Sequence, residues 1–381
     1  MKKKLYSLLL LAVGMVEAET LEKALENTTI DGYLRGTYHL HDIDGDKTYV
    51  DDAIGGKLHI ETPRFRGLSV GASFYTSHTL GDDDNRGLVP LRGESSSYSI
   101  LGEAYLNALY GNSMLKIGRQ EIETPFIQRD DIGMIPNTFE AIVLLNKDIK
   151  DTTITLAQVE KMAGVDAEVV DKFSPVNGDK NIQTLGVTYE GLKNLVLSGW
   201  YYNIEDGEID KITYLEANYE TSSNGMGYGL GLQYAKQGYS EGQTAKVMSA
   251  TLSSTFESMG LTLATAYTKT KDNASTSGFG GGPFFSNSEY LTIDSAGKDG
   301  KALWYGCEWD ANEVGLKGIS LALGKIVLEN EAKKKSTEVD FVASYEFNDN
   351  LEFHLIASDL KGKNVEEDEA KHLRAFVNYN F

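Results

Sequence analysis

The chain has a single cysteine, Cys307, in 381 residues, so it cannot form an internal disulfide bond. We expect Cys307 to be a small apolar side chain on a strand. Basic residues are also in deficit, with 36 Lys and Arg against 56 Asp and Glu and a formal net charge of −20. Proteins that bind nucleic acid present a basic face, so this balance argues against a nucleic-acid partner.

Long hydrophobic runs are missing beyond the first 18 residues. The densest run, residues 141–145, has five apolar residues, whereas a transmembrane helix needs about 20. The sequence therefore excludes a helical membrane protein.

Residues 1–18 have the pattern of a cleaved secretory signal peptide. Three lysines, Lys2 to Lys4, precede an apolar body that ends in a small-x-small site at Val16 and Ala18. An N-terminal anchor is the alternative. Cleavage after Ala18 predicts one exported domain over residues 19–381 and, with three lysines and one glutamate removed, takes the net charge from −20 to −22.

The rest of the chain alternates apolar and polar residues, which predicts β-strands. The first alternating run shows the two faces: Ile30, Leu34, Tyr38 and Leu40 against Asp31, Arg35, Thr37 and His39. Many runs last 10 to 13 residues, the length of a tilted membrane strand. Alternation does not say which face is inside, so a soluble exported β protein stays an alternative.

The connections between these runs fall into two alternating classes. Eight are short and rich in Gly and Asn, and nine are longer and charged, which gives about 18 strands. This asymmetry predicts an all-β fold, a transmembrane antiparallel β-barrel of the bacterial outer membrane with an aqueous lumen. The terminal Phe381 fits the signal recognised by the machinery that inserts such barrels.

One long connection, within residues 118–141, interrupts the alternation with six charges between residues 119 and 131 and with Pro125 and Pro136. Proline has no donor N–H, so the segment must be a loop, and a loop of about 16 residues is usually functional. By count it is the third outer loop. We expect it to fold inward and constrict the pore with charged residues: Glu121, Glu123, Arg129, Asp130 and Asp131.

None of the eight arginines lies between Arg129 and Arg374. Closing the barrel makes the last strand a neighbour of the first, so we predict a basic sector of the lumen formed by Arg35, Arg119 and Arg374, which would guide carboxylates. Arg119 lies on the same face of its strand as the apolar Leu115 and Ile117, so it reaches the lumen only if the strand ends or bulges there. Facing the loop acids, these bases would set up a transverse field.

Several motifs resemble the OprD-type family of outer-membrane porins. They are residues 118–120 (GRQ), Thr124-Pro125, residues 136–140 (PNTFE), residues 30–38 (IDGYLRGTY), residues 283–285 (PFF), residues 294–309 and residues 316–319 (LKGI). The resemblance implies an 18-stranded channel for small hydrophilic solutes, often carboxylates, whose third and seventh loops form a constriction. Family members commonly have an arginine where this chain has Gly133, which argues against tight carboxylate binding.

The function that follows is a passive diffusion channel for small hydrophilic solutes or ions, with a weak cation preference, no cofactor and no metal site. An outer-membrane enzyme and a plugged adhesive barrel are the alternatives. Histidines occur near strand ends, at His39, His41, His59 and His78, without a nucleophile motif or metal spacing, so we expect no enzyme. Expected partners are outer-membrane lipid and lipopolysaccharide, in a monomer or homotrimer.

Overall fold

The computed structural model describes residues 26–44, 48–80, 97–204, 207–362 and 369–381. The predicted signal peptide, residues 1–18, lies outside the described residues. The strands are β1 (Thr29–Ile43), β2 (Tyr49–Glu61), β3 (Leu68–Thr79), β4 (Ser97–Tyr110), β5 (Ser113–Gln120), β6 (Thr138–Asn146), β7 (Thr152–Ala163), β8 (Ser174–Asp179), β9 (Ile182–Leu192), β10 (Leu195–Ile204), β11 (Ile209–Ser223), β12 (Met226–Tyr239), β13 (Thr244–Phe256), β14 (Leu261–Lys271), β15 (Lys301–Asp310), β16 (Ile319–Glu329), β17 (Lys335–Glu346), β18 (Leu351–Lys361) and β19 (Ala370–Asn380). Three short 3-10 helices accompany them: η1 (Glu257–Met259), η2 (Ile293–Ala296) and η3 (Ala311–Val314).

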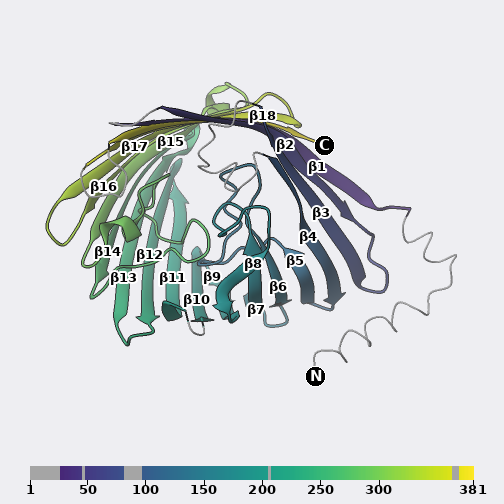
Figure 1. Ribbon diagram of the computed structural model, residues 1–381. Helices are drawn as coiled ribbons and strands as arrows, with labels where there is room; N and C mark the ends of the chain where they lie inside the picture. Colours follow the sequence, from purple (N-terminus) through teal and green to yellow (C-terminus); the bar gives the residue numbers. More distant parts are fainter. Residues whose placement is uncertain (1–25, 45–47, 81–96, 205–206, 363–368) are drawn as a thin grey trace.

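Eighteen of these strands form a closed antiparallel barrel, as predicted. Each pairs with its neighbour in sequence, and β19 closes the ring against β1 over the register from Tyr33–Asn380 to Ile43–Ala370. The short β8 is not part of the wall, since it pairs with only two residues of β7, which pairs directly with β9. Figure 1 shows the ring of strands with coiled segments of chain inside it. Among the described residues, no helix is long and apolar enough to cross a membrane.

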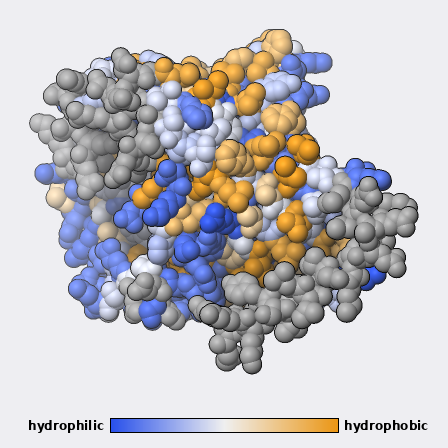
Figure 2. Space-filling view, turned by 45° about the vertical axis from the view of Figure 1, so that its right-hand side comes forward, coloured by the Kyte–Doolittle hydropathy of each residue, from blue (hydrophilic) through white to orange (hydrophobic). Residues whose placement is uncertain are grey.

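The polar face of each strand points into the barrel and the apolar face points out. On β1, Leu34 is 59% exposed whereas its neighbour Arg35 is 7% exposed. Figure 2 shows apolar side chains gathered over one side of the outer surface. An apolar outer band suits lipid, because hydrocarbon cannot hydrate polar side chains. Aromatic residues gather on the outer surface near the short turns: Tyr110, Tyr219, Tyr228, Tyr345, Phe347, Phe353, Tyr379 and Phe381.

The two ends of the barrel differ as the sequence predicts. Eight short turns connect strands at one end, and nine loops connect them at the other. The turn between β11 and β12 has two residues, Asn224 and Gly225, both with positive φ, which matches the twist of antiparallel strands. The loops of the other end therefore contain the length needed to enter the lumen.

Candidate functional site

The third loop, residues 121–137, folds inside the barrel and packs against the far wall. Phe126 is 1% exposed. Its ring meets those of Tyr202 on β10, Tyr214 on β11 and Phe284 of the seventh loop edge-on, with centroids 5.5, 5.6 and 5.9 Å away. The Phe126 backbone N–H also donates to the Tyr202 hydroxyl at 3.3 Å. An apolar contact thus fixes the tip of a charged loop.

The end of the same loop packs on the opposite side of the lumen. Met134 and Ile135 are 0% and 2% exposed, in a cluster with Ala53, Tyr75 and Ile100 on β2, β3 and β4. The loop is therefore anchored on both sides and crosses the lumen between them.

The seventh loop, residues 272–300, lies inside the barrel beside the third loop. The Gln128 N–H donates to the Phe279 carbonyl at 2.9 Å, and the Phe279 N–H donates to the Phe126 carbonyl at 2.8 Å. Lumenal side chains hold this loop to the wall. The Gln237 amide binds the Thr276 backbone in both directions, at 2.8 and 3.0 Å, and the Glu338 carboxylate accepts backbone N–H groups of the loop.

Arg35 ties the third loop to β1. Its guanidinium forms a bidentate pair with Asp131, at 2.7 and 3.1 Å, and donates to the Gly133 carbonyl at 2.6 Å. A third acceptor, the Asn378 amide oxygen on β19, lies 2.8 Å from Nε. Arg129 also contacts this carboxylate, with its Nη2 3.7 Å from Asp131 Oδ2.

From Arg129 onward, acidic and basic side chains alternate along the barrel wall. We call the whole series the charge row; its members are Arg35, Asp131, Arg129, Glu121, Lys57, Glu103 and Lys116. Glu121 lies 3.4 Å from Arg129 and 3.0 Å from Lys57 on β2. Lys57 also lies 3.0 Å from Glu103 on β4, and Glu103 lies 3.9 Å from Lys116 on β5. Every ammonium or guanidinium group of this row therefore has a carboxylate within 4.0 Å.

A second group of charges lies where the third, fourth and seventh loops meet. Burial, with the nearby Asp166 carboxylate, raises the pKa of Asp130 to about 7. Asp166 is held by the Asn137 amide, whose Nδ2 donates to it at 2.7 Å. Arg374 on β19 pairs with Glu289 of the seventh loop. Asp130 is therefore the carboxyl of this pair that takes up a proton first as the pH falls.

This architecture agrees with the comparisons with known proteins. A family model described as outer membrane porin, OprD family, matches residues 67–381. The chain belongs to the OprD family of outer membrane porins. It is therefore a diffusion channel of the outer membrane, as its motifs predict.

Solved structures of OprD-type porins are similar to it in fold. Pseudomonas aeruginosa OccK9 (OpdG) has a TM-score of 0.82 at 16% identity, covering 94% of this chain and 99% of that chain. P. aeruginosa OpdK, solved with vanillate, has a TM-score of 0.82 at 15% identity, covering 94% and 99%. Acinetobacter baumannii OccAB1 has a TM-score of 0.80 at 15% identity, covering 94% and 97%. No curated protein sequence matches the chain.

The structure brings most of the predicted porin site residues together. Arg35, Glu121, Arg129 and Asp131 lie in the charge row, and Asp130 lies in the second group with Arg374. Glu123 is exposed on the loop. The loop acids Asp131 and Glu121 lie in direct contact with wall cations, Arg35 and Lys57.

Arg119 does not belong to the lumenal basic sector. Strand β5 runs through Gln120 with an unbroken register on both sides, so Arg119 keeps the outward parity of Ile117. It lies 3.0 Å from Glu140 on β6, which also pairs with Lys161 on β7 at 2.7 Å. The neighbouring Lys116 is the inward cation of this strand.

Five residues of these two charged groups were not predicted: Lys57, Glu103, Lys116, Asp166 and Glu289. Lys57 and Lys116 could have been predicted from the alternation along their strands, since each is followed by an outward-facing residue, Leu58 or Ile117.

The histidines expected near strand ends include His39 and His41, both fully buried on β1. Within the described ranges, no cluster of three or more His, Cys, Asp or Glu could hold a metal ion. The acid-rich segment 82–84 of the second loop lies outside those ranges.

Proposed function

We propose that this porin is a cation-preferring diffusion channel whose eyelet is bounded by Glu121, Glu123, Arg129, Asp130 and Asp131 of the third loop, with Arg35 and Arg374 on the wall. The observation that supports this most is the pairing of the cations. Arg35, Lys57, Lys116, Arg129 and Arg374 each have a carboxylate within 4.0 Å. The acidic pair Asp130 and Asp166 adds further negative charge as the pH rises through the raised pKa of Asp130.

A paired cation attracts a passing anion weakly, because the field of its carboxylate partner cancels much of its own at a few ångströms. P. aeruginosa OpdK was solved with vanillate, a carboxylate. In this chain the Arg35 guanidinium is already occupied by Asp131 and the Gly133 carbonyl. We therefore expect small hydrophilic cations and neutral solutes to pass more readily than carboxylates.

We also propose roles for the parts of the protein that lie beyond the eyelet. Residues 1–18 are a cleaved signal peptide, and residues 19–381 form one barrel domain. Phe381, at the end of the closing strand, is the contact for the insertion machinery, and the outer rim contacts lipopolysaccharide. The mature barrel is a monomer or a homotrimer. We propose that it has no catalytic activity, in keeping with a family of channels.

The reversal potential of the purified porin in a planar lipid bilayer tests the selectivity. With a tenfold KCl gradient at pH 7.5, we expect the potential to have the sign of preferred K⁺ passage. The variant Glu121→Gln leaves Lys57 and Arg129 with one fewer carboxylate and should shift the potential toward anion preference. Clear anion preference of the unmodified channel would refute the proposal. Absence of any conductance would instead indicate a plugged barrel.

A further inference from the structure

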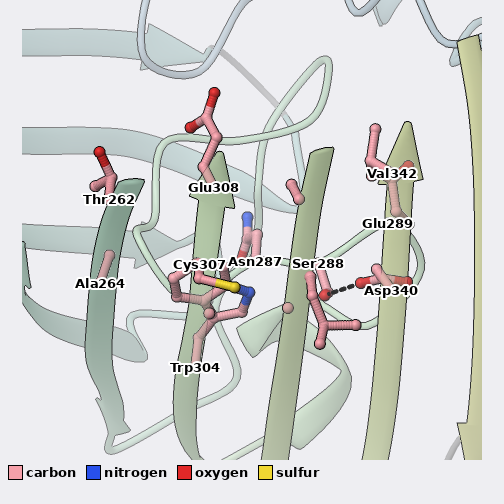
Figure 3. A pocket seen from close by; sticks show the side chains of 14 residues that line it. Thr262, Ala264, Asn287, Ser288, Glu289, Trp304, Cys307, Glu308, Asp340 and Val342 are labelled. Carbon is pink, nitrogen blue, oxygen red and sulfur yellow. Dashed lines mark hydrogen bonds between the residues drawn. The ribbon is translucent and has the colours of Figure 1, made fainter. Parts of the chain in front are cut away.

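A cavity of about 340 Å³ lies in the lumen between strands β14 to β17 and the seventh loop. Figure 3 shows its walls: Asn287 and Ser288 of the loop lie over the strands, which supply Thr262, Trp304, Glu308 and Asp340. The cavity is separate from the charge row of the third loop, which lies on β1, β2, β4 and β5.

The Trp304 ring forms a flat aromatic surface in this cavity because two residues beside it on the wall are glycines, which have no side chains. Gly306 on β15 and Gly324 on β16 are paired in register. A Cβ atom at either position would lie 2.9 to 3.2 Å from atoms of the Trp304 ring. The indole therefore lies against both glycines, and larger residues there would displace it.

The charged groups that line the cavity are all carboxylates. They are Glu289, Glu308 and Asp340, and no Lys, Arg or His joins them in its lining. Glu289 pairs with Arg374 on its other side. Asp340 is 6% exposed; Ser288 donates to one of its oxygens, and the Glu338 carboxyl on the same strand is hydrogen-bonded to it as well.

We propose that this cavity is a subsite for a small organic ammonium ion, held between the Trp304 indole and the carboxylates of Glu308 and Asp340. An aromatic platform with acidic side chains binds alkylammonium groups through cation–π attraction and charge. A neutral sugar would use the platform but would leave the carboxylates without a counter-ion. The inference rests on the proposed cation-preferring channel and names a class of solute for it.

Block of single-channel KCl current by choline tests the subsite. Choline should interrupt the current of the unmodified porin, and 3,3-dimethyl-1-butanol, its neutral carbon analogue, should not. Trp304→Leu should raise the half-blocking choline concentration about fivefold or more, and Trp304→Phe by less, because a phenyl ring retains part of the cation–π attraction. Glu308→Gln should weaken the block in the same direction.

Two control variants separate the subsite from general effects. Trp309→Leu removes the outward-facing tryptophan of the same strand, and Glu220→Gln removes a lumenal carboxylate near the end of β11. Choline should block both variants as it blocks the unmodified porin. Electrophoresis of unheated samples in SDS gels should show that all variants are folded barrels.

If choline does not block the channel, or if Trp304→Leu leaves the block unchanged, the subsite is overturned even if the KCl reversal potential shows cation preference. Equal block by the neutral analogue or by glucose would also overturn it. Anion preference with a Trp304-dependent choline block would instead refute the proposed selectivity and leave the subsite standing.

Discussion

Asp130 is the eyelet residue whose charge changes near neutral pH. It has a positive φ of 36°, and the backbone of the third loop places it beside Asp166 from the fourth. Two carboxylates in one partly buried place do not both ionise easily, so one keeps its proton to higher pH. The raised pKa, about 7, means that the eyelet gains negative charge as pH rises through that value.

Cation preference should therefore depend on pH. As pH increases from 5.5 to 8.5, we expect the reversal potential in a KCl gradient to move toward stronger K⁺ preference, with its midpoint near 7. Asp130→Asn should remove that step. Glu123→Gln, which removes an exposed carboxylate of the same loop, should keep it. A step of the same size and midpoint in Asp130→Asn would show that another group titrates.

The third loop is the element on which the channel depends, and it is held by contacts of two kinds. The Phe126 and Met134 ends are apolar and fix the loop to opposite walls, while the Arg35–Asp131 pair is charged and sits between them. Apolar anchors contribute most of the burial, whereas the bidentate pair gives the loop a defined position. Removing the pair should loosen the loop without unfolding the barrel.

Arg35→Ala tests this tether. Loss of a charge-assisted bidentate pair costs about 1.5–3 kcal/mol, so the undocked population of the loop should rise about tenfold or more. Open-channel current noise should increase and mean conductance should rise. Arg119→Ala removes an arginine from the outer face and should leave both unchanged. Equal noise in the two variants would mean that Arg35 does not position the loop.

The third loop was predictable from sequence, but its partners were not. Its charged residues, its prolines and its length indicate that residues 121–137 form a functional loop. The alternation of faces along β1 places Arg35 in the lumen. Glu103 was hidden because a bulge in β4 opposite Ser73 and Phe74 shifts the parity, so Ile100 and Glu103 both face inward. Asp166 and Glu289 lie in loops, where no periodicity indicates which side chain meets another.

The strands of the barrel wall and the loops inside it have separate functions. The strands form a ring that closes through backbone bonds between Gly32 and Phe381, at 3.1 and 3.0 Å, and its apolar outer face suits lipid. The wall was predictable because period-two alternation and turn chemistry are local properties of the sequence. A ring of 18 strands is too wide to be filled by its own side chains, so the pore must be narrowed by the third and seventh loops.

Replacing residues 122–135 with a short Gly/Ser linker and measuring single-channel conductance tests whether the third loop forms the constriction. Conductance depends on the narrowest section of the pore, so we expect an increase of about twofold or more. Electrophoresis of an unheated sample in an SDS gel should first show that the variant barrel is folded. Unchanged conductance in a folded variant would show that the third loop is not the constriction and that the narrowest section lies elsewhere.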